Sequence, residues 1–144
     1  KVVTPQMVKD VDDLLDLIKN AEDTEFDATS LPGGLSLDDD LTKRTSQLER
    51  LRQMVSDDDF NARMAAVKTL ARARELDNVP ALIYALSDPN PQIVREARDG
   101  LRFISRRFFG FNLPEKPSKD QVAVIQDKWE EWYLSIRPDG ELLE

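Results

Sequence analysis

The sequence predicts an all-α protein: a short α-solenoid of about two helical hairpins, flanked by an N-terminal amphipathic helix and a C-terminal capping helix. Three observations predict this fold. Apolar residues recur at three- and four-residue spacing in several blocks. The middle of the chain repeats itself at a spacing of 31 residues. The 144 residues are 40% hydrophobic and 33% charged, as expected for one folded domain.

The first helix is expected over residues 5–20, which we name the arm. Thr4 suits the N-cap and Pro5 the first helical position. The arm carries an apolar stripe at helical spacing, formed by Val8, Val11, Leu15 and Ile18. Residues 23–36 have no apolar period and contain Pro32-Gly33-Gly34, so residues 1–36 are predicted to be an amphipathic helix followed by a flexible linker.

The second helix is expected to begin after Ser36, which forms an approximate capping box with Asp39. The acidic run at residues 38–40 suits the positive end of a helix dipole. The buried stripe of this helix is predicted to consist of Leu41, Leu48, Leu51 and Val55.

An internal repeat organises the middle of the chain. A shift of 31 residues places Leu51, Ser56, Asp57, Ala66 and Leu70 on Leu82, Ser87, Asp88, Ala97 and Leu101. Each unit is a helix, a turn with Asp or Asn, and a second helix, so residues 41–75 and 78–107 are predicted to form two hairpins that stack on each other. The last helix of this region has a predicted buried stripe of Val94, Ala97, Leu101, Ile104 and Phe108.

The second unit carries a family resemblance. It resembles the short HEAT repeats, in particular the subclass first described in phycobilisome lyases, at Leu82, Leu86, Asp88, Pro89, Val94, Arg95, Ala97 and Leu101. The first unit fits more loosely, because Arg63 is one place out of register with Arg95. The resemblance implies that residues 37–110 form two HEAT-like repeats, and it implies little about activity.

Residues 111–144 are predicted to be an aromatic capping segment. Ser118 and Gln121 make a capping box, and Pro138 and Gly140 end the helix that follows. The amphipathic stripe of this helix is formed by Val122, Ile125, Trp129, Trp132, Tyr133 and Ile136. The segment is similar to the closing segment of many bacterial HEAT-repeat proteins, which implies an aromatic lid with both tryptophans largely buried against the second hairpin.

Composition removes most familiar catalytic chemistry. The chain has no Cys and no His, and so it lacks thiol nucleophiles, imidazole bases and imidazole metal ligands. The acidic runs at residues 38–40 and 57–59 lack the ligand spacing of a calcium loop and are expected to stabilise helix starts. We therefore expect no catalytic residue, no metal, no cofactor and only shallow grooves.

Charge is unevenly distributed. Residues 1–40 carry a net charge of -8, residues 41–110 +4 and residues 111–144 -4, which sum to the -8 of the chain. The cationic middle includes a row at helical spacing, formed by Arg95, Arg98, Arg102 and Arg106. The resemblance to HEAT proteins implies that this row lines a concave groove. Three alternatives remain open: contact with an acidic partner, contact with the chain's own acidic residues 10–27, and solvent exposure with local pairing to Glu96 or Asp99.

The predicted function is a non-catalytic protein–protein interaction module, an accessory or scaffold subunit that helps to assemble a larger complex. The alternatives are a HEAT-based enzyme such as a chromophore lyase and, less favoured because of the negative net charge, a nucleic-acid binder. The expected partners are other protein subunits with an acidic surface, and further copies of the chain joined through the arm as an oligomer or filament. No apolar run approaches the roughly 20 residues that span a membrane. If Lys1 is a mature N-terminus left by signal-peptide cleavage, the protein is extracytoplasmic; otherwise the compartment stays open.

Overall fold

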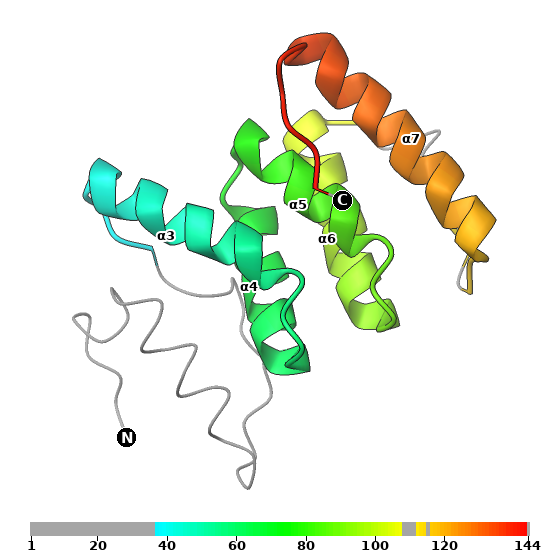
Figure 1. Cartoon of the computed structure of the whole chain (residues 1–144), viewed down its shortest axis with the longest axis horizontal. Coiled ribbons are helices and arrows are strands. Elements are labelled where there is room, and N and C mark those ends of the chain that lie inside the picture. Colours follow the sequence, from blue (N-terminus) through cyan, green and yellow to red (C-terminus); the bar gives the residue numbers. More distant parts are fainter. Residues whose placement is uncertain (1–36, 108–111, 115, 144) are drawn as a thin grey trace, which may run out of the picture.

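The computed structural model describes residues 37–107, 112–114 and 116–143. These residues form five α-helices and one short 3-10 helix, and no strand occurs among them (Figure 1). The helices are α3 (Leu41–Met54), α4 (Phe60–Arg72), α5 (Val79–Ala85), α6 (Pro91–Ser105) and α7 (Lys119–Ile136), with the 3-10 helix η2 at Leu76–Asn78. The predicted all-α fold, a short α-solenoid, is confirmed.

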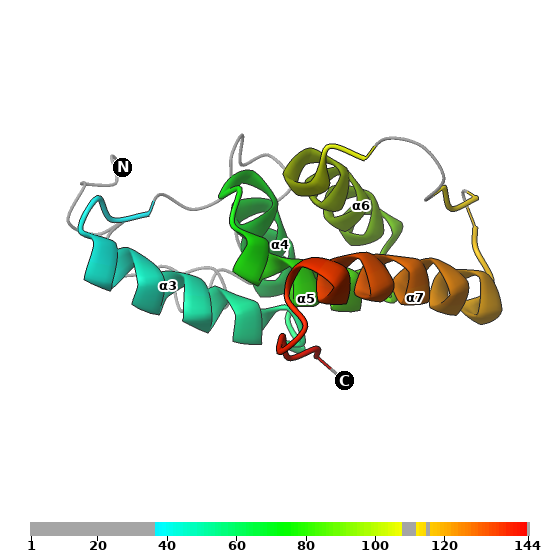
Figure 2. The same ribbon diagram turned by 90° about the horizontal axis from the view of Figure 1, so that it is seen from above.

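The helices lie in two layers. Figure 2 shows α3, α5 and α7 in one layer and α4 and α6 in the other, with α3 and α7 at opposite ends of the stack. Hairpins form between α3 and α4 and between α5 and α6, and the two hairpins are joined chiefly by contact of α4 with α6. α7 packs on α5.

The turns of the two hairpins have the same hydrogen bonds, as the 31-residue spacing predicts. The Oδ1 atom of Asp57 accepts from the backbone N–H of Asp59 at 2.9 Å, and that of Asp88 accepts from Asn90 at 2.9 Å. Asp59 and Asn90 then cap α4 and α6. The two matched serines, Ser56 and Ser87, each donate to the carbonyl three residues before. The repeat is therefore a repeat of structure.

The start of α3 differs from the prediction. Its N-cap is Asp40, whose side chain accepts from the N–H of Lys43 at 3.1 Å, and Ser36 lies outside the described residues. Leu41 was expected in the buried stripe but is 76% exposed, and it is the first residue of α3. Leu48 and Leu51 are fully buried, as predicted.

A glycine permits close packing between the hairpins. A Cβ added at Gly100 on α6 would lie 2.5 Å from the Cβ of Ala71 on α4 and 2.9 Å from its Cα. Such separations are too short for two carbon atoms that are not bonded to each other, so any side chain here would push α6 away from α4.

α6 buries a slightly different stripe from the predicted one. Ile93 is fully buried with Ala97 and Leu101, whereas Val94 is only half-buried. The buried face of α6 is shifted by about one residue from the predicted face, so Val94 lies at the edge of the core. Phe108, the last residue of the predicted stripe, lies outside the described residues.

α7 begins as predicted. Ser118 and Gln121 form the full capping box, with the Gln121 N–H donating to Ser118 Oγ at 3.2 Å and the Ser118 N–H donating to Gln121 Oε1 at 2.9 Å. Trp129 is fully buried, as expected, but Trp132 is only half-buried and Ile136 is exposed. α7 contacts a single helix of the second hairpin extensively, so only one face of it is covered.

Candidate protein-binding cleft

A cleft of about 850 Å³ lies between the second hairpin and α7. One wall is formed by the α5–α6 turn and the first half of α6, and the other by residues before and within α7. The prediction that the surface has only shallow grooves is therefore wrong. The cleft arises because α7 packs on α5 and does not cover the flank of α6.

The walls of the cleft are largely apolar. The core residues Leu86, at the end of α5, and Val122, in α7, contribute to it, and half-buried Val94 contributes from α6. Four prolines complete the apolar part of the lining: Pro89, Pro91, Pro114 and Pro117. Proline and valine side chains offer contact surface with little conformational entropy to lose when a partner binds.

The charged groups that line the cleft are mostly cationic. They are Arg95 and Arg98 from α6 together with Lys116 and Lys119 from the opposite wall. Among the described lining residues the single carboxylate is that of Asp88, and it is already engaged by Arg63. The cleft thus combines apolar walls with a cationic edge, which suits a ligand that carries both apolar and acidic groups.

The structure divides the predicted arginine row. Arg95 is exposed and lines the cleft, and Arg98 lines it while pairing with neighbouring Asp99 at 3.0 Å. Arg102 instead donates from Nη2 to Asn112 Oδ1 at 2.7 Å. Arg106 has a φ of 58° and ends α6, so it does not continue the helical row.

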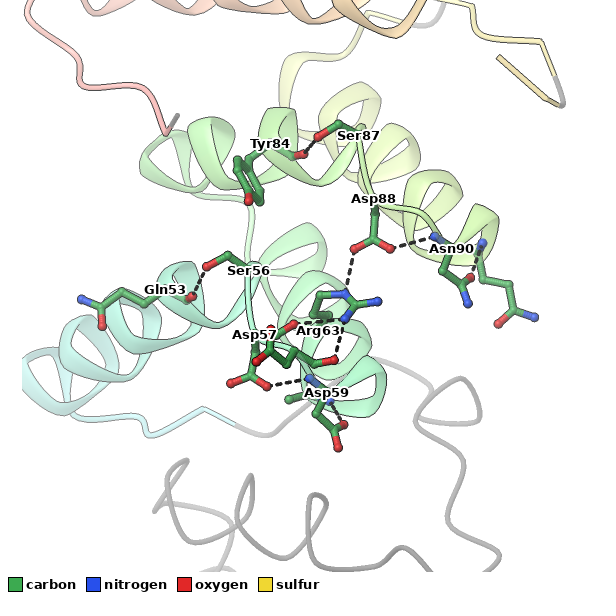
Figure 3. A network of polar contacts seen from close by, with 12 residues as sticks. Gln53, Ser56, Asp57, Asp59, Arg63, Tyr84, Ser87, Asp88 and Asn90 are labelled. Carbon is green, nitrogen blue, oxygen red and sulfur yellow. Dashed lines mark hydrogen bonds and ion pairs between the residues drawn. The ribbon is translucent and has the colours of Figure 1, made fainter. Parts of the chain in front are cut away.

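Arg63 has a structural role that sequence reasoning missed. Its Nε donates to Asp88 Oδ2 at 2.9 Å, while its Nη1 donates to the carbonyls of Asp57 and Asp58 at 3.0 and 3.1 Å (Figure 3). It joins the turn of the first hairpin to that of the second. The sequence offered one signal for this difference: Arg63 is one place out of the 31-residue register with Arg95. The two arginines indeed have different surroundings, since Arg63 bonds to the other hairpin and Arg95 lines the cleft.

The acidic runs at residues 38–40 and 57–59 stabilise the starts of α3 and α4. Asp38 Oδ1 accepts from the N–H of Asp40 at 2.8 Å, and Asp59 Oδ1 accepts from Ala62 at 3.0 Å. Among the described residues no group of three or more acidic side chains is placed to hold a metal ion. The predicted role of these runs in stabilising helix starts is confirmed by their backbone hydrogen bonds.

The arm and its stripe of Val8, Val11, Leu15 and Ile18 lie outside the described residues. In the part of the chain that the structure describes, no helix is long and apolar enough to cross a membrane.

Helical hairpins stacked in two layers define an α-solenoid protein. Residues 11–102 match the family model of HEAT repeats, which is more than half of the 144 residues, and the chain belongs to this family. No curated protein sequence and no solved structure shows a significant match to it.

Proposed function

We propose that this chain is a non-catalytic protein-interaction module, an accessory or scaffold subunit of a larger assembly. The observation that carries the proposal is the cleft between α6 and α7, whose apolar walls and cationic edge match a protein segment with apolar and acidic side chains. HEAT repeats are commonly protein-interaction modules, and membership of that family supports the same function.

The finer relationship is also part of the proposal. The repeats belong to the short subclass first described in phycobilisome lyases, in a protein of bacterial type, and α7 acts as the aromatic cap of the last hairpin. The burial of Trp129 against the second hairpin supports the cap. The matched positions of Asp57 and Asp88 in the two turns support the subclass.

A catalytic role is disfavoured by the chemistry of the cleft. A HEAT-based enzyme such as a chromophore lyase would need a reactive acid or base at the site. Asp88, the carboxylate among the described lining residues, is 4% exposed and bonded to Arg63, and so it is held in a structural pair. A nucleic-acid binder is disfavoured by the chain's net charge of -8, because phosphate would be repelled outside the cleft.

The proposal is tested by isolating the protein from its native source at low salt and identifying the proteins that travel with it. A cleft variant with Arg95 and Arg98 replaced by Gln should lose the partner, and raising the salt concentration should weaken the contact in the parent protein. The matched control replaces two exposed arginines that do not line the cleft, Arg50 and Arg72. Equal partner binding by the cleft variant and the parent would overturn the role of the cleft, and co-isolation of nucleic acid in place of protein would overturn the proposed function.

A further inference from the structure

In the described part of the chain, the stack ends with a single helix, α7. α7 lies in the layer of α3 and α5, which are the first helices of the two complete hairpins (Figure 2). It therefore lies in the layer where a third hairpin would have its first helix, although it runs in the opposite direction to α3 and α5 (Figure 1). In the part of the chain that the structure describes, no helix lies beside α6 where the second helix of that hairpin would be, and the cleft is found between α6 and α7.

The cleft specifies the chemistry of the absent helix. Half-buried Val94 and Leu113 favour an apolar stripe on that helix. Arg95 and Arg98 on one wall and Lys119 on the other require acidic residues beside that stripe. An acidic amphipathic helix satisfies both requirements.

The arm has this composition. Its stripe is formed by Val8, Val11, Leu15 and Ile18, and Asp12 and Asp16 lie four residues apart on the adjoining helical face. Residues 5–27 contain eight acidic residues against Lys9 and Lys19. The family match that begins at residue 11 includes most of the arm, which supports its assignment as a HEAT helix.

The order of helices in a solenoid favours the arm of another copy. In a continuous stack, the second helix of one hairpin is followed in the chain by the first helix of the next. The arm precedes α3, so an arm placed beside α7 would be followed by the α3–α4 hairpin of its own copy. The two placements are distinguished by the mass in solution, which rises only if the arm of another copy binds.

We propose that residues 5–20 of a second copy bind in the cleft between α6 and α7 and complete a third hairpin with α7. This inference rests on the proposed assembly function and names its site and its partner. The two contacting surfaces differ, so the contact is heterologous. Repetition produces a ring if the rotation between copies closes and a filament if it does not.

Charge exchange between two full-length variants tests the proposal. One variant carries Arg95→Glu and Arg98→Glu in the cleft, and the other carries Asp12→Lys and Asp16→Lys in the arm. Each variant alone places like charges together and should associate at least about tenfold more weakly than the parent chain. In an equal mixture, the acidic cleft meets the basic arm and the unmodified cleft meets the unmodified arm, so association should return.

The measurement is the mass in solution by sedimentation or light scattering over a range of concentrations. A matched control, Arg106→Glu with Arg107→Glu, makes the same change of net charge at exposed positions outside the cleft and should leave association unchanged. In the parent chain, raising the ionic strength from about 0.1 to 1 M shortens the screening length from about 10 to 3 Å and should reduce association.

Three results would overturn the inference: a parent chain that remains a 16.4 kDa monomer throughout, variants that associate like the parent, and a mixture that associates no better than its components. The proposed function fails separately. If the cleft variant still loses a heterologous protein partner while the parent chain is monomeric, the interaction function stands and the self-assembly site does not.

Discussion

At the scale of single residues, Arg63 and Asp88 join the two hairpins. The side chains are 15% and 4% exposed, so the pair is largely removed from water. Asp88 also accepts from the N–H of Asn90, which connects the ion pair to the start of α6. Arg63 also donates from Nη1 to the Asp57 and Asp58 carbonyls, so one side chain holds both turns together.

Removal of this arginine should be costly. Arg63→Met leaves the Asp88 carboxylate buried without its cation, and we expect the free energy of unfolding to fall by about 3 kcal/mol. Urea unfolding followed by circular dichroism measures the change. The control is Arg98→Met, which breaks the more exposed pair with Asp99 and should cost no more than about 1 kcal/mol. Equal losses in the two variants would mean that the buried pair does not join the hairpins.

Gly100 tests how close the two hairpins must be. Alanine normally improves a helix interior relative to glycine by about 1 kcal/mol. Here Gly100→Ala should instead destabilise the protein by about 1–3 kcal/mol, because its methyl group would overlap Ala71. Ala71→Gly in the same chain should restore part of the loss, since it removes the clashing Cβ but leaves the Ala71 Cα at 2.9 Å. A more stable Gly100→Ala variant would contradict the observed packing.

At the scale of elements, α7 is attached to the stack by apolar burial and by two polar contacts. Trp129 is fully buried, and Gln126 donates from Nε2 to the carbonyl of Ile83 on α5 at 3.0 Å. Arg137, just after the helix, pairs with Asp77 in η2. Gln126 and the core residue Val122 also line the cleft, so the cleft borders the same side of α7 that packs on the stack.

The two tryptophans of α7 should differ in their contribution to stability. Trp129→Ala should lower the free energy of unfolding by about 3–5 kcal/mol, because it removes a fully buried side chain. Trp132→Ala should cost less, since Trp132 is half-buried and meets Trp129 edge to face at a centroid distance of 5.8 Å. Val124→Ala at an exposed position is the control. Thermal unfolding of Trp129→Ala indistinguishable from that of the parent would mean that α7 does not stabilise the isolated chain.

The end of α6 is conformationally strained. Arg106 adopts a left-handed conformation, with φ 58° and ψ 28°, that is unfavourable for residues with a Cβ. Arg106→Gly should therefore stabilise the protein by about 0.5–1 kcal/mol. The same change within the helix, Arg95→Gly, should destabilise it by about 1 kcal/mol. Effects of the same sign in the two variants, measured by urea unfolding, would contradict this assignment of the helix end.

At the scale of the whole molecule, the described residues form two hairpins and one additional helix, α7. Solenoids gain stability from the interfaces between neighbouring repeats, and about three repeats are usually needed. In the second hairpin, α5 is covered by α7, and the neighbouring side of α6 lines the cleft. A partner helix that fills the cleft would supply the absent interface.

Light scattering on the full chain and on a shortened chain tests whether the arm joins copies of the protein. The full chain should show a concentration-dependent mass above 16.4 kDa, and a chain that begins at Leu35 should not, because it lacks the arm. Circular dichroism of the shorter chain provides the control for folding. A stable monomer in both cases, with equal partner binding, would refute the role of the arm in assembly.

Much of the fold was predictable because it depends on local patterns. The 31-residue register predicted the paired turns at Asp57 and Asp88, and Ser118 with Gln121 predicted the start of α7. The errors concern exposure. Leu41 and Trp132 fit the apolar spacing but remain exposed or half-buried, because periodicity identifies the apolar side of a helix and does not show how far a neighbouring helix covers it.

The candidate site was predicted only in part. Arg95 and Arg98 were identified from their spacing, but Lys116 and Lys119 on the opposite wall were not, because they lie far from α6 in the chain. The sequence alone determined the described helices, the capping box of α7, the repeat and the absence of thiol and imidazole chemistry, since these depend on residues near one another or on composition. Only the tertiary structure shows that Arg63 bonds to Asp88 of the other hairpin and that the backbone of Gly100 packs closely against Ala71. It also shows the cleft beside α7. These features depend on distances between helices, which are set by packing of side chains from separate segments.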